Sequence, residues 1–210
     1  PRRIIALDVD DDRLAFLQRR FAPLAESRGV SLDVVDARED GVVASLVEAA
    51  SEGRGADDVV MVAASADLVR QADSWLAPHG MLVLFAGLKR GTEVPVLLDR
   101  VPLGGAQYTG TSGSTMEDHR RVVAMAAAGE LDPVRSLAAV AGLAAVPDGI
   151  EALMSGRYAG KIVILPRARS LPLRSVEELL ELEPGLREAC GPGGEWTLAA
   201  EELLAARYGA

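Results

Sequence analysis

The chain has few of the side chains that disulfides and cysteine–histidine metal sites require. Its 210 residues include one cysteine, Cys190, and two histidines, His79 and His119. A single cysteine cannot form an internal disulfide, and these three side chains cannot assemble a Cys/His zinc site. We therefore expect any catalytic metal to be held by residues outside this chain.

Long apolar runs and clustered positive charge are also missing. No apolar run approaches the ~20 residues that span a bilayer, and no positively charged, apolar leader precedes the first strand. We therefore expect a cytoplasmic protein that binds no membrane. The 22 Lys and Arg against 31 Asp and Glu give a net charge of −9. Because phosphate backbones would be repelled and no basic stripe is present, we expect no nucleic-acid partner.

The first half of the chain has the pattern of an α/β protein. Strand-like runs alternate with helical patterns up to about Ser112, which is typical of a parallel sheet covered by helices. Five strands are expected, with a turn at residues 78–80 before the fourth: residues 3–8, 31–36, 58–63, 81–86 and 107–111. Apolar residues at helical spacing predict the crossover helices: residues 13–21, 42–50 and 68–76.

The second half begins with a helix and ends in an acidic tail. A capping-box spacing at residues 114–117 predicts a helix to about Ala128. Further elements are expected after this helix: extended residues 137–143, a short helix at 147–154 and a final strand at 161–165. We therefore divide the chain into three parts: a partial nucleotide-binding domain at 1–136, a segment at 137–166 and a helical tail at 167–210.

The tail differs from the rest in charge. From residue 171 onward it contains eight Glu and three Arg. A capping-box spacing at residues 175–178 and a cap at Thr197 predict two helices, the second running through Arg207. We interpret the tail as an acidic appendage that packs on the main domain through four leucines: Leu179, Leu182, Leu198 and Leu203.

Asp8 ends the first apolar run, and Arg13 follows at the head of the next helical pattern. A carboxylate at the carboxyl end of a parallel strand can accept both hydrogen bonds from an adenosine ribose diol, and a nearby guanidinium can stack on adenine. Alternatively, Asp8 is a helix N-cap or a turn residue, because the acidic run through Asp12 offers several candidate caps. The local residues leave both interpretations open.

The other half of a dinucleotide site is missing. Such folds have a glycine-rich turn at the amino end of a helix, one βα unit before the strand of Asp8. The strand preceding this turn would lie at the centre of a doubly wound sheet, between the strands at 3–8 and 58–63. Its removal would leave unpaired edges and a split core. We expect the natural protein to contain the missing part, and a stable, folded, monomeric preparation of these 210 residues alone would contradict this hypothesis.

Four segments, in order and spacing, resemble the medium-chain dehydrogenase/reductase superfamily: residues 55–60, 78–87, 109–114 and 160–164. The resemblance covers about residues 1–166 and is greatest to the zinc-dependent polyol, sugar and threonine dehydrogenase branch. The tail after Pro166 is similar to that of longer-chained polyol or sugar-phosphate reductases, including those acting on sorbose 1-phosphate. The resemblance implies a Rossmann-like doubly wound parallel sheet lacking its first strand, and a GroES-like catalytic domain, outside this chain, that holds zinc.

The resemblance also implies a row of cofactor-binding residues and NAD in preference to NADP. Asp8 would bind the adenosine ribose, and Arg13 would lie against the adenine. A carboxylate facing a 2′-phosphate at ~4 Å would repel it by about 4 kcal/mol at an effective dielectric of about 20, before relaxation, and Arg13 would partly offset this. The other implied residues lie along the rest of the cofactor: Ala63, Ala64 and Ser65 beside it, Phe85, Ala86, Gly87 and Leu88 near the nicotinamide ribose and ring, and Gly110, Thr111 and Ser112 beside the carboxamide.

Ordinary structural roles compete at several of these positions. Glycine after a strand is common, so Gly87 and Gly110 could simply end strands. Residues 112–115 could serve only to cap a helix. We interpret His79 as a surface residue, and neither it nor His119 as an acid/base group.

The resemblance implies the NAD-binding portion of a zinc-type alcohol, polyol or sugar-phosphate dehydrogenase, which transfers hydride between a secondary alcohol or ketone and nicotinamide. A zinc-free quinone-type reductase of the same superfamily and a non-catalytic nucleotide-binding module are the alternatives. The resemblance further suggests a homodimer or homotetramer with residues 91–101 at the subunit contact. The apolar run at 94–98 could equally pack under the domain.

Overall fold

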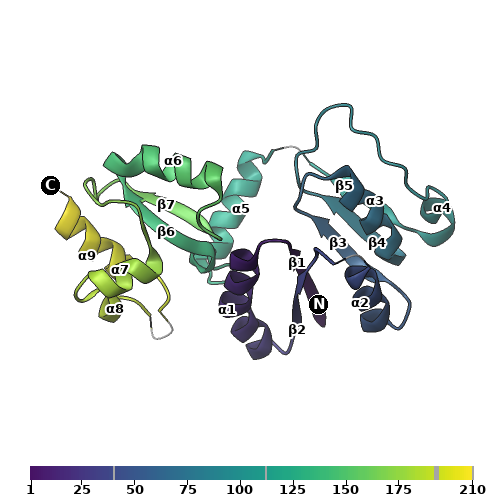
Figure 1. Cartoon of the computed structure of the whole chain (residues 1–210), viewed down its shortest axis with the longest axis horizontal. Helices are drawn as coiled ribbons and strands as arrows, with labels where there is room; N and C mark the ends of the chain where they lie inside the picture. Colours follow the sequence, from purple (N-terminus) through teal and green to yellow (C-terminus); the bar gives the residue numbers. More distant parts are fainter. Residues whose placement is uncertain (40, 112, 192–193, 210) are drawn as a thin grey trace. The chain divides into compact units, whose positions relative to one another are not determined.

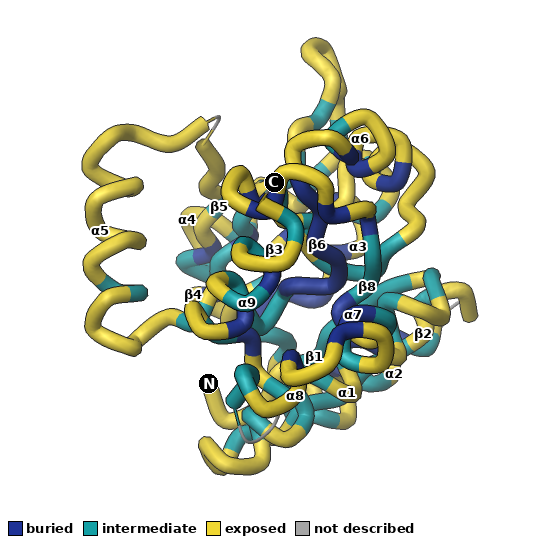
Figure 2. The backbone as a smooth tube through the Cα atoms, turned by 90° about the vertical axis from the view of Figure 1, so that its left-hand side faces the viewer, coloured by how far each residue is buried: buried dark blue, intermediate teal, exposed yellow. Residues whose placement is uncertain are grey.

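The computed structural model describes residues 1–39, 41–111, 113–191 and 194–209. The chain forms two compact units, which we describe separately (Figure 1). Unit 1 comprises residues 1–36 and 124–209, and unit 2 comprises the described residues of 37–123. Helix α5 (Met116–Ala127) contributes residues to both and has no buried residue, as its mostly yellow tube shows in Figure 2.

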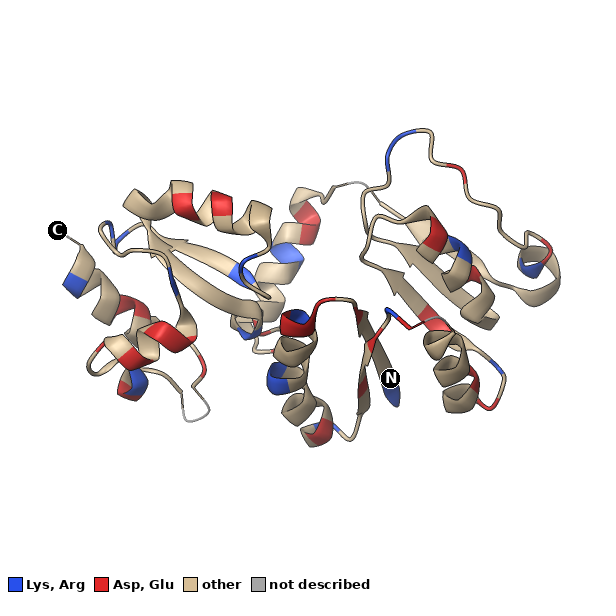
Figure 3. Cartoon of the chain, in the orientation of Figure 1, with Lys and Arg blue, Asp and Glu red and all other residues tan. Residues whose placement is uncertain are grey.

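Unit 1 begins with two parallel strands joined by a helix. β1 (Arg3–Asp8) pairs with β2 (Ser31–Asp36) along its whole length. Both strands have the predicted bounds. Helix α1 (Asp11–Ser27) is longer than predicted at both ends. It starts at Asp11 because Asp10 caps it, accepting a hydrogen bond from the backbone N–H of Arg13 at 2.9 Å. Acidic residues gather at this amino end of the helix (Figure 3), where they complement the helix dipole.

The second sheet of unit 1 is built around a strand of small residues. β6 (Leu137–Gly142) pairs parallel with β7 (Lys161–Leu165) and antiparallel with β8 (Arg174–Ser175). Helix α6 (Val146–Ser155) makes the crossover from β6 to β7. Every residue of β6 is buried, and the strand is dark blue in Figure 2. The predicted final strand and short helix are confirmed within one or two residues.

The described residues of the tail form three helices, not the two predicted: α7 (Val176–Leu182), α8 (Leu186–Ala189) and α9 (Leu198–Tyr208). The additional helix, α8, is only one turn long, and no capping pattern marks its start. The capping box predicted at the start of α7 is confirmed, because Glu178 N–H donates to Ser175 Oγ at 3.0 Å and Ser175 N–H donates to Glu178 Oε2 at 2.8 Å. The predicted cap of α9 is also confirmed, since Thr197 Oγ1 accepts from Ala200 N–H at 3.2 Å.

The tail is part of the main core of unit 1 rather than a surface appendage. It packs on Leu137 and Val140 of β6 and on Leu165 of β7, and contributes most of the cluster: Leu171, Val176, Leu179, Leu186, Trp196, Ala200 and Leu204. Each fully buried leucine or valine of this kind contributes roughly 1.5–3 kcal/mol through removal of apolar area from water. The tail therefore stabilises the β6–β7 sheet.

Two of the four predicted packing leucines are wrong. Leu179 is buried and Leu203 packs partly against the core, but Leu182 is 61% exposed and Leu198 is 68% exposed. The reason is helical spacing. The buried face of α7 runs through residues 176, 179 and 183, and that of α9 through 200 and 204, so Leu182 and Leu198 fall beside these faces.

Unit 2 contains a three-stranded parallel sheet in the order β3-β4-β5. Its elements along the chain are α2 (Val42–Ser51), β3 (Ala56–Met61), α3 (Ala66–Trp75), β4 (Leu76–Leu84), α4 (Arg100–Gly104) and β5 (Gln107–Gly110). Among the described residues, β1 and β3 do not pair with each other. The α/β class with Rossmann-like parallel sheets is confirmed.

The predicted turn before the fourth strand is wrong. β4 already starts at Leu76, which pairs with Ala56, while Asp58 pairs with Met81, so residues 78–80 form an irregularity within the strand. His79 there has φ +63° and is exposed. A Cβ on Gly80 would lie 2.9 Å from the Ala56 carbonyl oxygen, so the close approach of β3 favours glycine.

The cap of α5 lies one residue later than predicted. Thr115 and Asp118 form the reciprocal pair: Thr115 N–H donates to Asp118 Oδ2 at 2.7 Å, and Asp118 N–H donates to Thr115 Oγ1 at 3.2 Å. The box predicted at residues 114–117 is therefore wrong, because a neighbouring Thr-x-x-Asp has the same spacing. Among the described residues, each helix is too short or too polar to cross a membrane.

Candidate functional site

Asp8 lies at the carboxyl end of β1 and holds Arg13 in a bidentate ion pair. Asp8 Oδ1 accepts hydrogen bonds from the backbone N–H groups of Val9 at 2.7 Å and Asp10 at 3.0 Å. Arg13 donates through Nη2 to Oδ1 at 2.9 Å and through Nε to Oδ2 at 2.8 Å. The side chain of Asp8 is 23% exposed and that of Arg13 is 43% exposed, so both can be reached from solvent.

These contacts determine the charge state of the pair. Partial burial acts to raise the pKa of Asp8, but the hydrogen bonds from Arg13 and from two backbone N–H groups outweigh it, so the pKa lies below its ordinary value. The pKa of Arg13 is raised, chiefly by its hydrogen bond to Asp8. The pair is therefore fully ionised at neutral pH.

The alternative interpretation of Asp8 as a helix N-cap is wrong, because Asp10 caps α1. Asp8 instead accepts from the backbone of the next two residues, as a turn aspartate does. Asp8 is therefore a turn residue. Part of its carboxylate remains exposed at the carboxyl end of β1, and ligands bind at such strand ends in open α/β sheets.

The residues predicted beside the cofactor after β3 lie in the loop to α3. β3 ends at Met61, and Ala63 and Ala64 are exposed. Ser65 donates its N–H to the Ala63 carbonyl oxygen at 3.0 Å and caps α3, with its Oγ accepting from Leu68 N–H at 3.3 Å. Capping α3 is a structural role of Ser65, and the position of this serine directly before a helical pattern could have indicated it.

The residues predicted near the nicotinamide follow β4. Phe85 is 73% exposed. The N–H groups of Phe85 and Ala86 both donate to the Met61 carbonyl oxygen, at 3.1 and 2.9 Å, which ties this segment to the end of β3. Gly87 is exposed and Leu88 is half-buried.

The third group of predicted residues follows β5. Gly110 ends this strand, and a Cβ there would lie 2.7 Å from the Leu84 carbonyl oxygen, so the approach of β5 to β4 itself favours glycine. Thr111 is exposed. Ser112 lies outside the described residues.

Asp8 and Arg13 lie in unit 1, and the other described candidates, from Ala63 to Thr111, lie in unit 2. Each group lies at the carboxyl ends of parallel strands of its own sheet, the edge at which ligands bind in α/β folds.

A buried polar cluster in unit 2 was missed by the sequence analysis. Asp73, which is 4% exposed, accepts from Tyr108 Oη at 2.5 Å and from Leu97 N–H at 3.1 Å, while Arg100 donates to the Asp73 carbonyl oxygen at 2.7 Å. Burial and the bond to Asp73 raise the pKa of Tyr108 to about 12. The cluster fixes the segment before β5 onto α3. Its partners are separated by 24 to 35 residues, so no local pattern could indicate it.

The two histidines make no hydrogen bond with the candidate residues that the structure describes. His79 is exposed in the irregularity of β4, as predicted for a surface residue. His119 Nε2 lies 2.6 Å from Ser114 Oγ, and both side chains are exposed. Neither arrangement requires an acid/base role.

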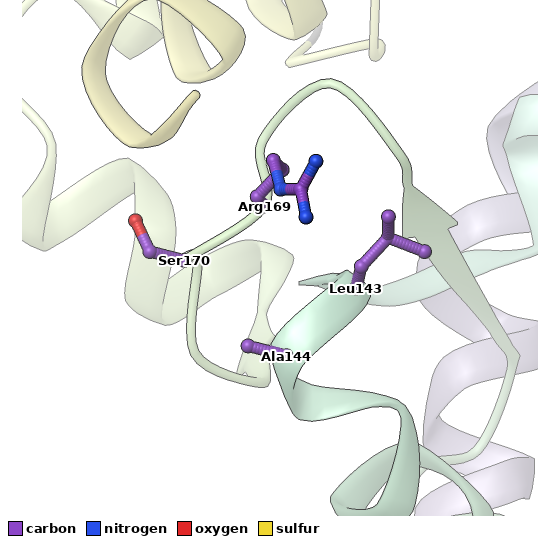
Figure 4. A pocket seen from close by; sticks show the side chains of 4 residues that line it. All are labelled: Leu143, Ala144, Arg169 and Ser170. Carbon is purple, nitrogen blue, oxygen red and sulfur yellow. The ribbon is translucent and has the colours of Figure 1, made fainter. Parts of the chain in front are cut away.

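The described residues contain no group of three or more His, Cys, Asp or Glu that could hold a metal ion. A pocket of about 400 Å³ in unit 1 is lined by Leu143, Ala144, Arg169 and Ser170 (Figure 4). Arg169 is its only charged lining residue, and Ser170 Oγ donates to the Tyr208 carbonyl oxygen. This pocket lacks the paired acid and base groups of an active site.

A model of the zinc-binding dehydrogenase family matches residues 32–164, which is more than half of the chain. The chain belongs to the zinc-binding dehydrogenase family. This agrees with the medium-chain dehydrogenase resemblance of the sequence.

Two bacterial relatives are named for reactions of sugar or polyol phosphates. The chain is 30% identical to the mannitol-1-phosphate 5-dehydrogenase of Aliivibrio fischeri, over 87% of this chain and 43% of the relative. It is 27% identical to the L-sorbose 1-phosphate reductase of Klebsiella pneumoniae, over 98% of this chain and 48% of the relative. The chain therefore spans about half the length of the curated relatives it matches.

Solved structures of the same class share the fold. The crystal structure of 2R,3R-butanediol dehydrogenase from Bacillus subtilis matches with a TM-score of 0.57 and 21% identity, covering 77% of this chain and 43% of that one. At this identity the likeness concerns the fold alone.

Proposed function

We propose that this chain is the NAD-binding portion of a zinc-type dehydrogenase that acts on a polyol or sugar phosphate. When bound, NAD supplies the hydride acceptor or donor for interconversion of a secondary alcohol and a ketone. The observation that carries the proposal is the Asp8 carboxylate, partly exposed at the carboxyl end of β1. In a chain of this family, that position suits the two hydroxyl donors of an adenosine ribose.

The residues present fit this cofactor in two respects. Asp8 offers acceptor oxygens only, which match hydroxyl donors and would repel a 2′-phosphate. Gly87 provides weaker support. A Cβ there would meet nothing within 4 Å, and its φ lies outside the left-handed region. Because the chain's own atoms do not require glycine at this position, close approach of a ligand to the backbone is a reason for it.

The substrate class rests on the named activities of the two relatives. Both act on six-carbon polyol or sugar phosphates by their printed names. The described residues do not fit a zinc site, so we propose that zinc, where the enzyme uses it, is held by polypeptide beyond these residues.

The cofactor proposal is tested by measuring the binding of NADH and of NADPH through the fluorescence of the nucleotide. Asp8→Asn should weaken NADH binding and reduce the preference for NADH over NADPH, because the repulsive charge is removed. Asp12→Asn is the matched control: Asp12 is an exposed acid in the first turn of the same helix. Equal affinities of the unsubstituted chain for NADH and NADPH, or an Asp8→Asn variant that binds like Asp12→Asn, would contradict the proposal.

The reaction is tested on the protein purified from its natural source. Intact mass and zinc analysis come first, followed by assays of NAD reduction with mannitol 1-phosphate and related polyol phosphates. Turnover without zinc would favour the quinone-type reductase. Nucleotide binding without turnover of any substrate would favour a non-catalytic module.

We also propose that the protein is a homodimer or homotetramer that uses the segment before β5. Leu97 and Leu98 of this segment are 53% and 69% exposed, while Val94 and Val96 are half-buried. Leu98→Asp should therefore lower the mass measured by light scattering. An unchanged mass would contradict a contact at this segment.

A further inference from the structure

We propose that Arg13 closes the Asp8 site in the free protein, and that an adenosine ribose binds only by displacing the Arg13 guanidinium. This inference rests on the proposed nucleotide-binding function and concerns how that site opens. It makes Arg13 a positioning residue whose ion pair sets the affinity for the ribose.

A carboxylate has a limited number of acceptor positions, because its two oxygens offer about four lone-pair sites. In this structure Asp8 receives four hydrogen bonds, two from backbone N–H groups and two from Arg13. Three of them reach Oδ1 and one reaches Oδ2, so Oδ1 is fully occupied and one position remains on Oδ2. A ribose diol that donates two hydrogen bonds therefore cannot place both while Arg13 stays bound.

Of these donor groups, only the Arg13 guanidinium can move away without unfolding the turn. The N–H groups of Val9 and Asp10 belong to the backbone between β1 and α1. The backbone of Arg13 is also fixed, because its own N–H donates to the Asp10 carboxylate at 2.9 Å. The Arg13 side chain is 43% exposed, so its guanidinium can rotate into solvent while the helix stays in place.

The exchange replaces two charge-assisted hydrogen bonds with two hydroxyl donors to the same oxygens. Ion pairs that are this exposed are weak and are screened by salt. The released guanidinium can then lie against the adenine, as the family resemblance implies. Arg13 thus contacts Asp8 in the free protein and the adenine when the nucleotide is bound.

The exchange predicts an unusual dependence on salt. Adenosine is neutral, so salt has little direct effect on its attraction to the protein. Salt weakens the Asp8–Arg13 pair that the ligand must break, and adenosine binding should therefore tighten as salt increases. A site already open in the free protein would show no such tightening.

The experiment measures adenosine binding to the intact natural protein by calorimetry, together with the ¹⁵N–¹H signal of Arg13 Nε. Between about 20 and about 500 mM NaCl, the adenosine Kd of the unsubstituted chain should fall about two- to threefold. The Kd of Arg13→Gln should not change with salt. Saturating adenosine should shift the Arg13 Nε signal and speed its hydrogen exchange.

A matched control comes from the same pair of strands. Arg3 Nε donates to Asp33 Oδ2 at 2.6 Å, in an exposed ion pair between β1 and β2. Arg3→Gln removes an equivalent pair elsewhere on the sheet and should retain the salt-dependent tightening.

The outcomes separate this inference from the proposed function. Adenosine binding that needs Asp8 but does not tighten with salt, or that leaves the Arg13 Nε signal unchanged, overturns the inference and leaves the proposed function standing. Adenosine binding that is unaffected by Asp8→Asn, or absent from every variant, overturns both. The measurements on the unsubstituted chain decide the matter even where Arg13→Gln does not fold.

Discussion

Glu183 is the buried charge whose removal should most clearly affect unit 1. Its side chain is 8% exposed and accepts hydrogen bonds from Arg207 Nη1 and Tyr208 Oη, near the carboxyl end of α9. It follows α7 directly, as the cap residue of that helix. The cluster thus joins the end of α7 to the end of α9 across the tail core.

The expected cost of Glu183→Gln follows from these two bonds. A hydrogen bond to a charged group contributes about 1.5–3 kcal/mol, and the Arg207 bond lies at the lower end because that side chain is 39% exposed. We therefore expect the free energy of unfolding to fall by about 3–4.5 kcal/mol at neutral pH. Glu181→Gln makes the same charge change at an exposed position of α7 and should alter stability by less than about 0.5 kcal/mol.

The effect should depend on pH in a definite direction. Burial acts to raise the pKa of Glu183, but its bonds to Tyr208 and Arg207 outweigh this, so the folded pKa lies below the ordinary value of 4.5. A carboxylate with a lowered pKa stabilises the folded state above the unfolded pKa, and this contribution is lost as pH falls through the folded value. The difference between Glu183→Gln and the unsubstituted chain should therefore shrink in acid below about pH 4.

Urea unfolding, monitored by tryptophan fluorescence, measures the difference in free energy of unfolding between Glu183→Gln and the unsubstituted chain. Trp196 belongs to the same core as the tail helices, and Trp75 lies in unit 2, so a Trp75→Phe background reports unit 1 alone. The reasoning is refuted if Glu183→Gln is no less stable than Glu181→Gln at pH 7. It is also refuted if the loss of stability is as large at pH 3 as at pH 7.

Three further predictions concern two glycines and one partly buried phenol. Gly142→Ala should lower the free energy of unfolding of unit 1 by at least about 1 kcal/mol, because the new Cβ would meet the Ala168 carbonyl oxygen. An unchanged urea midpoint would refute this. Gly149→Ala should raise stability by about 0.5–1 kcal/mol, since it lies inside α6 with its nearest contact at 3.6 Å; a loss of stability would refute it. Tyr108 should titrate at about pH 12 by ultraviolet absorption, so its contribution to stability is complete below pH 10 and is lost as pH rises through 12. Asp73→Asn should lower that pKa, and an unchanged titration would show that burial alone raises it.

Local chemistry made much of the fold predictable. β1 and β2 have the predicted bounds because each is an apolar or alternating run closed by aspartate. The caps of α7 and α9 were predictable for the same reason: the Ser-x-x-Glu box and the threonine cap act within three residues. Where one short-range pattern determines a strand or a helix cap, the sequence is sufficient to predict it.

Prediction failed where two patterns competed or where partners lie far apart. Residues 78–80 have turn chemistry, yet the close approach of β3 draws them into β4 as an irregularity. The cap of α5 was misplaced because two overlapping spacings fit. Hydrogen bonds such as those of Asp73 and Glu183 join residues more than twenty positions apart. Only the tertiary fold determines them.

The candidate cofactor residues were predictable as strand ends, but not in their free-state contacts. Asp8 was predicted to accept hydrogen bonds from a ribose, whereas in the structure Arg13 and two backbone N–H groups already donate four hydrogen bonds to it. A sequence pattern reports which groups are present and omits the intramolecular donors that compete with a ligand. The salt dependence of adenosine binding measures this competition directly.

The division of the chain into two units makes the tests independent of one another. Asp8 and Arg13 belong to unit 1, while Phe85, Gly87 and Gly110 belong to unit 2. Adenosine binding therefore examines the ribose contacts alone, and discrimination of NADH from adenosine examines the residues after β4 and β5. If adenosine binds through Asp8 but NADH binds no more tightly, the residues of unit 2 contribute nothing to affinity in this chain. Tighter NADH binding that Gly87→Val abolishes, with adenosine binding unchanged, would assign the nicotinamide end to unit 2.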